Sequence, residues 1–142
     1  MIGLATEEMR SMAILGMDWG ARRIGFAVKP AGMDYVLPRG VVMVGNEQEA
    51  VRVVRAVIEE AAAGAIVVGI PLYRDPAQAQ IIRRFCRRTR CGIRGTRWFF
   101  TDEYLTTQAA DSMSRNSLAG KETDDLAAKL ILESWLQEAG FD

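Results

Sequence analysis

Acidic residues occur at three places where an apolar segment of the chain begins or ends. They are Asp18, the pair Asp102 and Glu103, and the pair Asp124 and Asp125. A carboxylate at the end of a buried strand is costly to desolvate unless a cation compensates its charge. Each acid also has a plain structural role, since Asp favours turns, helix caps and the first turn of a helix. If folding brings these acids together, the same residues form a site for a divalent cation.

The residue types that are missing narrow the chemistry. The chain has no histidine and only two cysteines. This excludes a Ser-His-Asp triad, a Cys-His nucleophile pair and a zinc site that contains histidine. Any metal would therefore be held by carboxylate oxygens, which favours Mg²⁺ or Mn²⁺.

The length and composition are those of one globular domain. The chain has 142 residues, of which 49% are hydrophobic and 25% charged, and its formal net charge is zero. No run reaches the roughly 18–20 apolar residues of a membrane span, and the first residues lack the pattern of a signal peptide. We therefore expect no membrane association, a cytoplasmic location, a frayed N-terminal extension at 1–12 and one domain at 13–138.

The apolar patterns predict an α/β fold. Residues 13–18 and 24–29 are typical of a hairpin, and 35–44 of a third strand with Pro38 at an edge. The next segments alternate between helix and strand: helix 47–63, strand 65–70, helix 77–90, strand 96–101 and helix 106–114, followed by a loop at 117–122 and a last helix that Thr123 caps. The side chains expected to face the core are Ile81, Ile82 and Phe85 on helix 77–90 and Leu126, Leu130, Ile131 and Trp135 on the last helix. We expect a mixed five-stranded sheet, antiparallel over its first three strands and then parallel through crossovers, with helices on both faces.

This order of elements gives the acids a common location. Ligands of open α/β sheets bind outside the carboxyl ends of parallel strands. Asp18 ends the first predicted strand, Glu103 follows the last one, and the helix that starts at Thr123–Asp125 can lie against the same edge. Carboxylates that converge there match what a metal site for phosphodiester hydrolysis requires.

Four blocks of the chain, in the same order, resemble the signature blocks of the YqgF (RuvX-like) family. The blocks are "GMDWGARRIGFAV", "IVVGIPL", "DEYLTT" and "TDDLAAKLILESWL", and together they span nearly the whole chain. The family is described as Holliday junction resolvase-like proteins and as pre-16S rRNA nucleases, with an RNase H-like fold. The resemblance therefore implies a Mg²⁺- or Mn²⁺-dependent nuclease whose partner is nucleic acid, either structured RNA or branched DNA.

The resemblance also implies roles for single residues. Asp18, Glu103 and Asp124 match the three acidic metal ligands, while Asp125 falls where the family has a small residue. The sequence departs from the family pattern at Tyr104, where an Arg is usual, in "YRDP" after the second block, and in a loop before the last helix with few basic residues. These departures affect phosphate contacts rather than the metal ligands.

Basic residues near the predicted site are candidates for binding phosphate. Arg22 and Arg23 follow Asp18 in the hairpin turn, and guanidinium groups bind phosphate through two hydrogen bonds. One of the two could instead pair with Asp18 or Asp102. Thr106 and Thr107 can contact phosphate or cap a helix. The arginine-rich helix 77–90 presents two rows, one with Arg84 and Arg88 and the other with Arg83, Arg87 and Arg90, which can follow a nucleic-acid backbone or form a solvated face.

Two alternatives to a nuclease remain at this point. One is a non-catalytic factor on the same fold that binds RNA or a ribosome precursor, which Tyr104 and the thinned basic loop favour. The other is an actin-like ATP-handling domain, because "GMDWGARRIG" resembles the phosphate-binding hairpin of that class. We expect a monomer or a homodimer. Trp98, Phe99 and Phe100 are expected to pack in the core rather than stack on bases.

Overall fold

The computed structural model describes residues 6–102 and 123–141, with side chains of the last helix described from Asp125 onward. The strands are β1 (Ala13–Trp19), β2 (Arg23–Lys29), β3 (Leu37–Met43), β4 (Ala63–Ile70) and β5 (Arg97–Asp102). The helices are α1 (Thr6–Ser11), α2 (Glu47–Ala61), α3 (Pro76–Arg90) and α5 (Thr123–Glu138). None of these helices is long and apolar enough to cross a membrane.

The strands form one mixed sheet in the order β3-β2-β1-β4-β5. β1, β2 and β3 pair antiparallel, whereas β4 pairs parallel with both β1 and β5. The parallel core therefore directs the carboxyl ends of β1, β4 and β5 to one edge. This confirms the predicted fold class.

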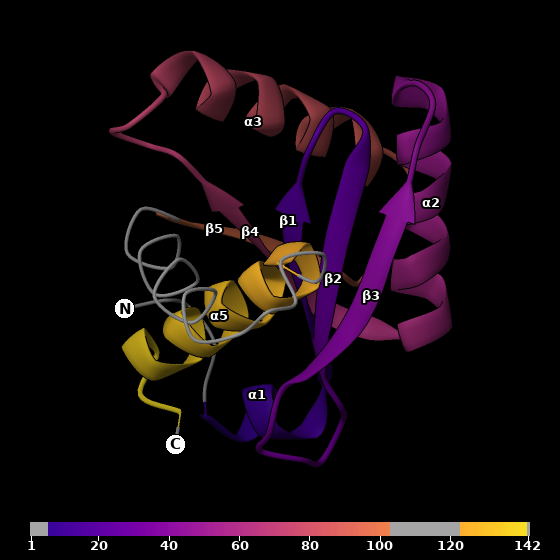
Figure 1. Cartoon of the computed structure of the whole chain (residues 1–142). Coiled ribbons are helices and arrows are strands. Elements are labelled where there is room, and N and C mark those ends of the chain that lie inside the picture. The colour runs from indigo at the N-terminus through magenta and orange to yellow at the C-terminus, as the bar shows by residue number, and fades with distance from the viewer. Residues whose placement is uncertain (1–5, 103–122, 142) are drawn as a thin grey trace.

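Helices cover both faces of the sheet (Figure 1). α2 and α3 pack on one face, where Leu15, Phe26 and Val68 belong to the core. α5 packs on the other face, where the core contains Ile14, Val67 and Trp135 among others. Strand side chains alternate between the two faces of the sheet. Residues two apart on β1 or β5 therefore face the same helices, and neighbouring residues face opposite ones.

Local sequence explains where the long helices begin. The Asn46 side chain caps α2 by accepting a hydrogen bond from the Glu49 backbone N–H at 2.8 Å. Asp75 caps α3 in the same way through Gln78 at 3.1 Å, and Pro76 occupies the first turn of α3. Both predicted helices are confirmed.

The structure differs from the sequence-based expectations in three places. Residues 6–11 form α1 instead of a frayed end, because the buried Met9 side chain anchors this turn in the core below α5. Ile81, expected to face inward, is 46% exposed, since the inward face of α3 runs through Ala79, Ile82 and Phe85. Phe100, expected in the core, is 37% exposed.

The apolar face of α5 is also shifted from its predicted position. Ile131 and Trp135 are buried as expected, but Leu126 and Leu130 are only half-buried, and Ala128, Leu132 and Leu136 are buried in their place. The predicted helix 106–114 and the loop 117–122 lie outside the described residues.

Candidate active site at the carboxyl edge of the sheet

Asp18 lies near the carboxyl end of β1 on the face covered by α5. A Cβ atom at Gly16 would lie only 2.7 Å from the carbonyl oxygen of Ala128 in α5, so Gly16 faces that helix. Asp18, two residues further along β1, faces the same side. Its partner on β2 is Gly25, and on β4 Gly69 follows Val68, the partner of Met17. Neither glycine has a side chain that would crowd the Asp18 carboxylate.

The direction of α5 brings its N-terminus toward Asp18. Ala128 contacts β1 at Gly16, whereas Phe141, just beyond the helix, has its ring 5.6 Å from the Lys29 Nζ at the other end of the hairpin. Lys29 pairs with Ile14 near the amino end of β1. α5 therefore runs toward the amino end of β1, and its first turn, with Asp124 and Asp125, is nearer to the carboxyl end.

The other predicted ligands are only partly described. Asp125 is half-buried in the first turn of α5, while the Asp124 side chain and all of Glu103 lie outside the described part. Within that part no group of three acids and cysteines is positioned to hold a metal ion. The three-carboxylate site stays a prediction, because Asp18 is the one predicted ligand whose side chain lies in the described part.

Asp102 shares the carboxyl edge with Asp18 but faces the opposite side of the sheet. It is the last residue of β5 and pairs with Ile70. Trp98, four residues earlier, packs into the core under α2 and α3, so alternation directs Asp102 to that side as well. Asp18 and Asp102 each interact with another residue. Asp102 is therefore less suited than Asp18 to share a cation with α5.

The donor chemistry of this edge fits a hard divalent cation. Asp18 and the first turn of α5 provide carboxylate oxygens, the ligands that Mg²⁺ and Mn²⁺ prefer. Soft ligands do not compete in the described part: Cys86 is buried within α3, and burial raises the pKa of its thiol to about 12. Cys91 is exposed beyond the end of α3.

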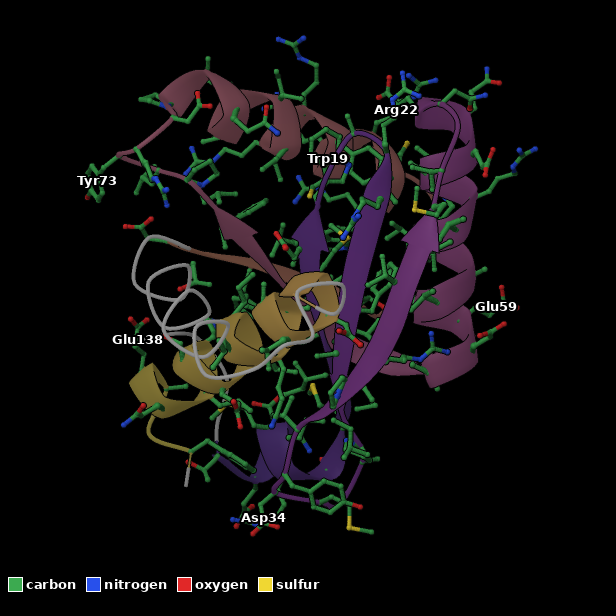
Figure 2. The ribbon with its side chains drawn as sticks, in the orientation of Figure 1. Trp19, Arg22, Asp34, Glu59, Tyr73 and Glu138 are labelled. Carbon is green, nitrogen blue, oxygen red and sulfur yellow. The ribbon has the colours of Figure 1, made fainter. Side chains whose placement is uncertain are left out.

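The two hairpin arginines separate onto different sides. Arg23 starts β2 two residues before Gly25, so it faces the same side of the sheet as Asp18. Arg22 lies at the hairpin tip, where its carbonyl accepts the Val44 N–H at 2.9 Å just before α2, and Figure 2 shows it at the top of the view. Gly20 permits this turn, because a Cβ there would lie 2.7 Å from the Arg23 carbonyl oxygen.

The arginines of α3 form the two predicted rows, in different surroundings. Arg84 lines a hollow of about 290 Å³ with Trp19, Ala21 and Glu47, and Arg88 forms a salt bridge to Glu47 at 3.3 Å. Arg83, Arg87 and Arg90 line a second hollow against β5. Thr106 and Thr107 lie outside the described residues.

One feature of the surface was missed by the sequence reasoning. Phe100 lies on the outer strand of the described sheet, exposed beside the second arginine row. A run of three aromatic residues in a strand usually marks the core, and the sequence carries no signal that this strand is at the edge with a basic helix over it.

Comparison with known proteins assigns the chain to a family. The RuvX profile, described as "Holliday junction resolvase", matches residues 12–138. A protein of Pseudomonas aeruginosa named "Putative pre-16S rRNA nuclease" is 36% identical over 133 residues, which cover 88% of this chain and 92% of that protein. A protein of the same name from Chlamydia caviae is 30% identical, and the alignment covers 94% of this chain and 88% of that protein.

Solved structures support the fold. RuvC of T. thermophilus in complex with a Holliday junction substrate matches with a TM-score of 0.62 at 15% identity, covering 92% of this chain and 98% of that one. The fowlpox virus resolvase in complex with Holliday junction DNA matches with a TM-score of 0.57 at 11% identity, covering 90% and 99%. The family profile and the two relatives confirm the resemblance seen in the sequence blocks.

Proposed function

The chain belongs to the RuvX family, and we propose that it is a divalent-metal-dependent endonuclease that acts on structured nucleic acid. The substrates we propose are the 5′ end of pre-16S rRNA, branched DNA such as Holliday junctions, or both. The observation that carries this proposal is the placement of Asp18 on the α5 side of the carboxyl edge, toward which the first turn of α5 points. We place the protein in the cytoplasm, as a monomer or homodimer.

In this mechanism Asp18, Glu103 and Asp124 hold Mg²⁺ or Mn²⁺. A bound divalent ion supplies activation of water and neutralisation of charge on the scissile phosphate. The β1–β2 ladder holds the backbone of Asp18, so its side chain extends from a regular strand. Ligands on strands are placed more precisely than ligands on loops, which helps to preorganise a site before substrate arrives.

Arginine side chains position the nucleic acid around this centre. Arg23, on the Asp18 side, binds the phosphate next to the cleaved bond, and Arg22 binds a phosphate further along. Arg84 and Arg88 contact the backbone beyond the hairpin, where phosphate competes with Glu47 for Arg88. Thr106 and Thr107 donate hydrogen bonds to phosphate oxygens.

Cleavage of a defined substrate panel tests the proposal. The panel contains a four-way DNA junction, linear duplex DNA and pre-16S rRNA, each with Mg²⁺, Mn²⁺ or EDTA. We expect metal-dependent cleavage of at least one structured substrate and a loss of about 100-fold or more in Asp18→Asn, because metal ligands provide several kcal/mol to such reactions. The matched control is Asp34→Asn, which should cleave normally, because Asp34 is an exposed acid at the opposite end of the molecule from the hairpin tip (Figure 2).

The same panel separates the nuclease from its main alternative. If Asp18→Asn cleaves as fast as the unmodified protein, the proposed site is wrong. If nucleic acid binds equally in EDTA and no product forms with either metal, the protein is a binding factor on this fold.

A further inference from the structure

We infer that the hollow between α3 and β5 binds one unpaired nucleotide of the substrate, its base against Phe100 and its phosphates on the arginine row Arg83, Arg87 and Arg90. This inference rests on the proposed function only in taking nucleic acid as the ligand. It assigns a contact surface distinct from the metal ligands and from the hairpin arginines.

The size of the hollow suits one nucleobase. Its volume is about 250 Å³, below the roughly 300–1,000 Å³ of pockets for drug-sized ligands. Its lining consists of Arg83, Cys86, Arg87, Arg90, Trp98 and Phe100. Phe100 is 37% exposed, unusual for phenylalanine in a strand, so part of its ring is available to another molecule. Base–aromatic stacking is the common device of proteins that bind single strands.

The charge of the hollow suits phosphate. Arg83, Arg87 and Arg90 repeat at helical spacing along the side of α3 that faces β5. None of the three forms a salt bridge with a carboxylate of the described residues, in contrast to Arg88, which is held by Glu47. The Arg83 guanidinium carbon lies 5.7 Å from the Phe100 ring centroid, so a cation and an aromatic face already adjoin there.

The position of the hollow connects it to the proposed centre. Phe100 pairs with Val68, and Val68 pairs with Met17, the neighbour of Asp18. Two strand spacings, about 10 Å, therefore separate Phe100 from the end of β1. β5 is the outer strand of the described sheet, so a nucleic-acid strand that leaves the α5 side can pass over the carboxyl edge and reach the hollow within a few nucleotides.

The ligand is unpaired because a paired base cannot present its face. In a duplex both faces of each base are covered by neighbours, whereas loops, ends and junction branch points offer unstacked bases. The hollow thus gives the protein a means to prefer substrates with an unpaired nucleotide close to the cleaved bond.

Binding measured without metal tests this inference. The probe is a fluorescent 12-nucleotide single-stranded RNA, and a 12-base-pair blunt duplex is the comparison, both in EDTA. We expect Phe100→Leu to weaken single-strand binding by roughly 5- to 100-fold, as loss of one stacked base does, and to leave duplex binding within 2-fold. Phe100→Tyr should keep the stacking and the affinity.

Charge variants add a second readout. Arg87→Ala should weaken single-strand binding and lower the slope of log affinity against log salt by about 0.7, the value for one lost phosphate contact on a single strand. The matched controls are Arg52→Ala and Tyr35→Ala, which should bind as the unmodified protein does. Arg52 is an exposed arginine on α2, and Tyr35 is an exposed aromatic residue at the other end of the molecule.

The outcomes separate this inference from the proposed function. Unchanged single-strand affinity and salt slope in Phe100→Leu and Arg87→Ala would overturn the nucleotide hollow even if metal-dependent cleavage is intact. Single-strand binding that depends on Phe100 and Arg87, with no cleavage of any substrate, would support the hollow and overturn the nuclease. Because these side chains are exposed, melting temperatures within a few degrees of the unmodified protein establish that all variants fold.

Discussion

At the scale of single residues, the two cysteines differ in what they can do. Cys86 is buried in α3 under β5, and Cys91 is exposed just beyond the helix. Burial raises the pKa of the Cys86 thiol to about 12 from an ordinary value of 9.0, and the nearby Arg90 offsets this only in part. The thiolate is the reactive form of cysteine, so Cys86 is chemically quiet in the folded protein.

The raised pKa predicts a pH-dependent stability. Below pH 9 the thiol is neutral in both states; between pH 9 and 12 only the unfolded chain loses the proton, so the free energy of unfolding falls as pH rises. The expected loss between pH 8 and pH 10 is about 1 kcal/mol. Urea unfolding at both pH values measures this loss. The free energy of unfolding should fall by about 1 kcal/mol more in the unmodified protein than in Cys86→Ala, which has no thiol to titrate. An equal pH dependence in the two proteins would contradict the prediction.

Some single residues could be read from the sequence, and others needed the fold. The position of Asp18 near a strand end could be predicted from the apolar run before it, because strand and turn patterns are local. The burial of Lys29 could not be predicted, because a lysine at a strand end is normally exposed. Here it is fully buried, and Nζ donates to the carbonyls of Arg10, Pro30 and Met33 at 2.9–3.2 Å. These acceptors come from α1 and the turn after β2, which local patterns do not bring together.

At the scale of elements, the contact between β1 and α5 sets the geometry of the candidate site. Gly16 lets α5 approach closely, since a Cβ there would lie 2.7 Å from the Ala128 carbonyl oxygen and 2.9 Å from the Leu132 Cβ. A backbone carbonyl and a Cβ atom of a helix cannot rotate out of the way, as the end of a long side chain can. Even one added methyl group must therefore push the helix away from the strand.

This contact predicts the effect of Gly16→Ala. We expect a loss of ~1–3 kcal/mol in the free energy of unfolding, the usual cost of overpacking, and a further decrease of metal-dependent cleavage because the first turn of α5 moves away from Asp18. Chemical denaturation and single-turnover cleavage under folding conditions measure the two effects. Gly45→Ala is the control, since its Cβ would lie 3.4 Å from the flexible Glu49 carboxylate. Full activity in a folded Gly16→Ala protein would show that this approach does not matter for the site.

The elements were largely predictable, and the exceptions share a physical cause. Hydrophobic periodicity and capping residues predict the bounds of all five strands and of helices α2, α3 and α5 to within a few residues, because these signals depend on residues close together in the sequence. The exposure of Ile81 and Phe100 depends on which strand lies at the edge and how α3 is rotated over it. α1 is a single short stretch whose stability comes from the burial of Met9 against other elements.

At the scale of the whole molecule, the fold converts a neutral chain into separate charged regions. The formal net charge is zero, yet the α3 arginines gather on one side of the sheet and the Asp18 centre faces the other. The parallel strands β1, β4 and β5 join the two sides at their common carboxyl edge. A substrate that crosses this edge would contact the proposed metal site and then the basic hollow. The net charge of the chain gives no sign of this separation of charged regions.

The same arrangement predicts that metal ions stabilise the folded protein even without substrate. The unfolded chain does not hold Asp18 near the start of α5, so a divalent ion binds mainly the folded state and raises its stability by mass action. At about ten times its dissociation constant, Mn²⁺ should add ~1.4 kcal/mol, which is roughly 4 °C in melting temperature for a chain of this size. Asp18→Asn should lose this shift, whereas Asp34→Asn should keep it. Calorimetry with and without Mn²⁺ makes the measurement, and an equal shift in all three proteins would place the bound ion elsewhere than at the carboxyl edge.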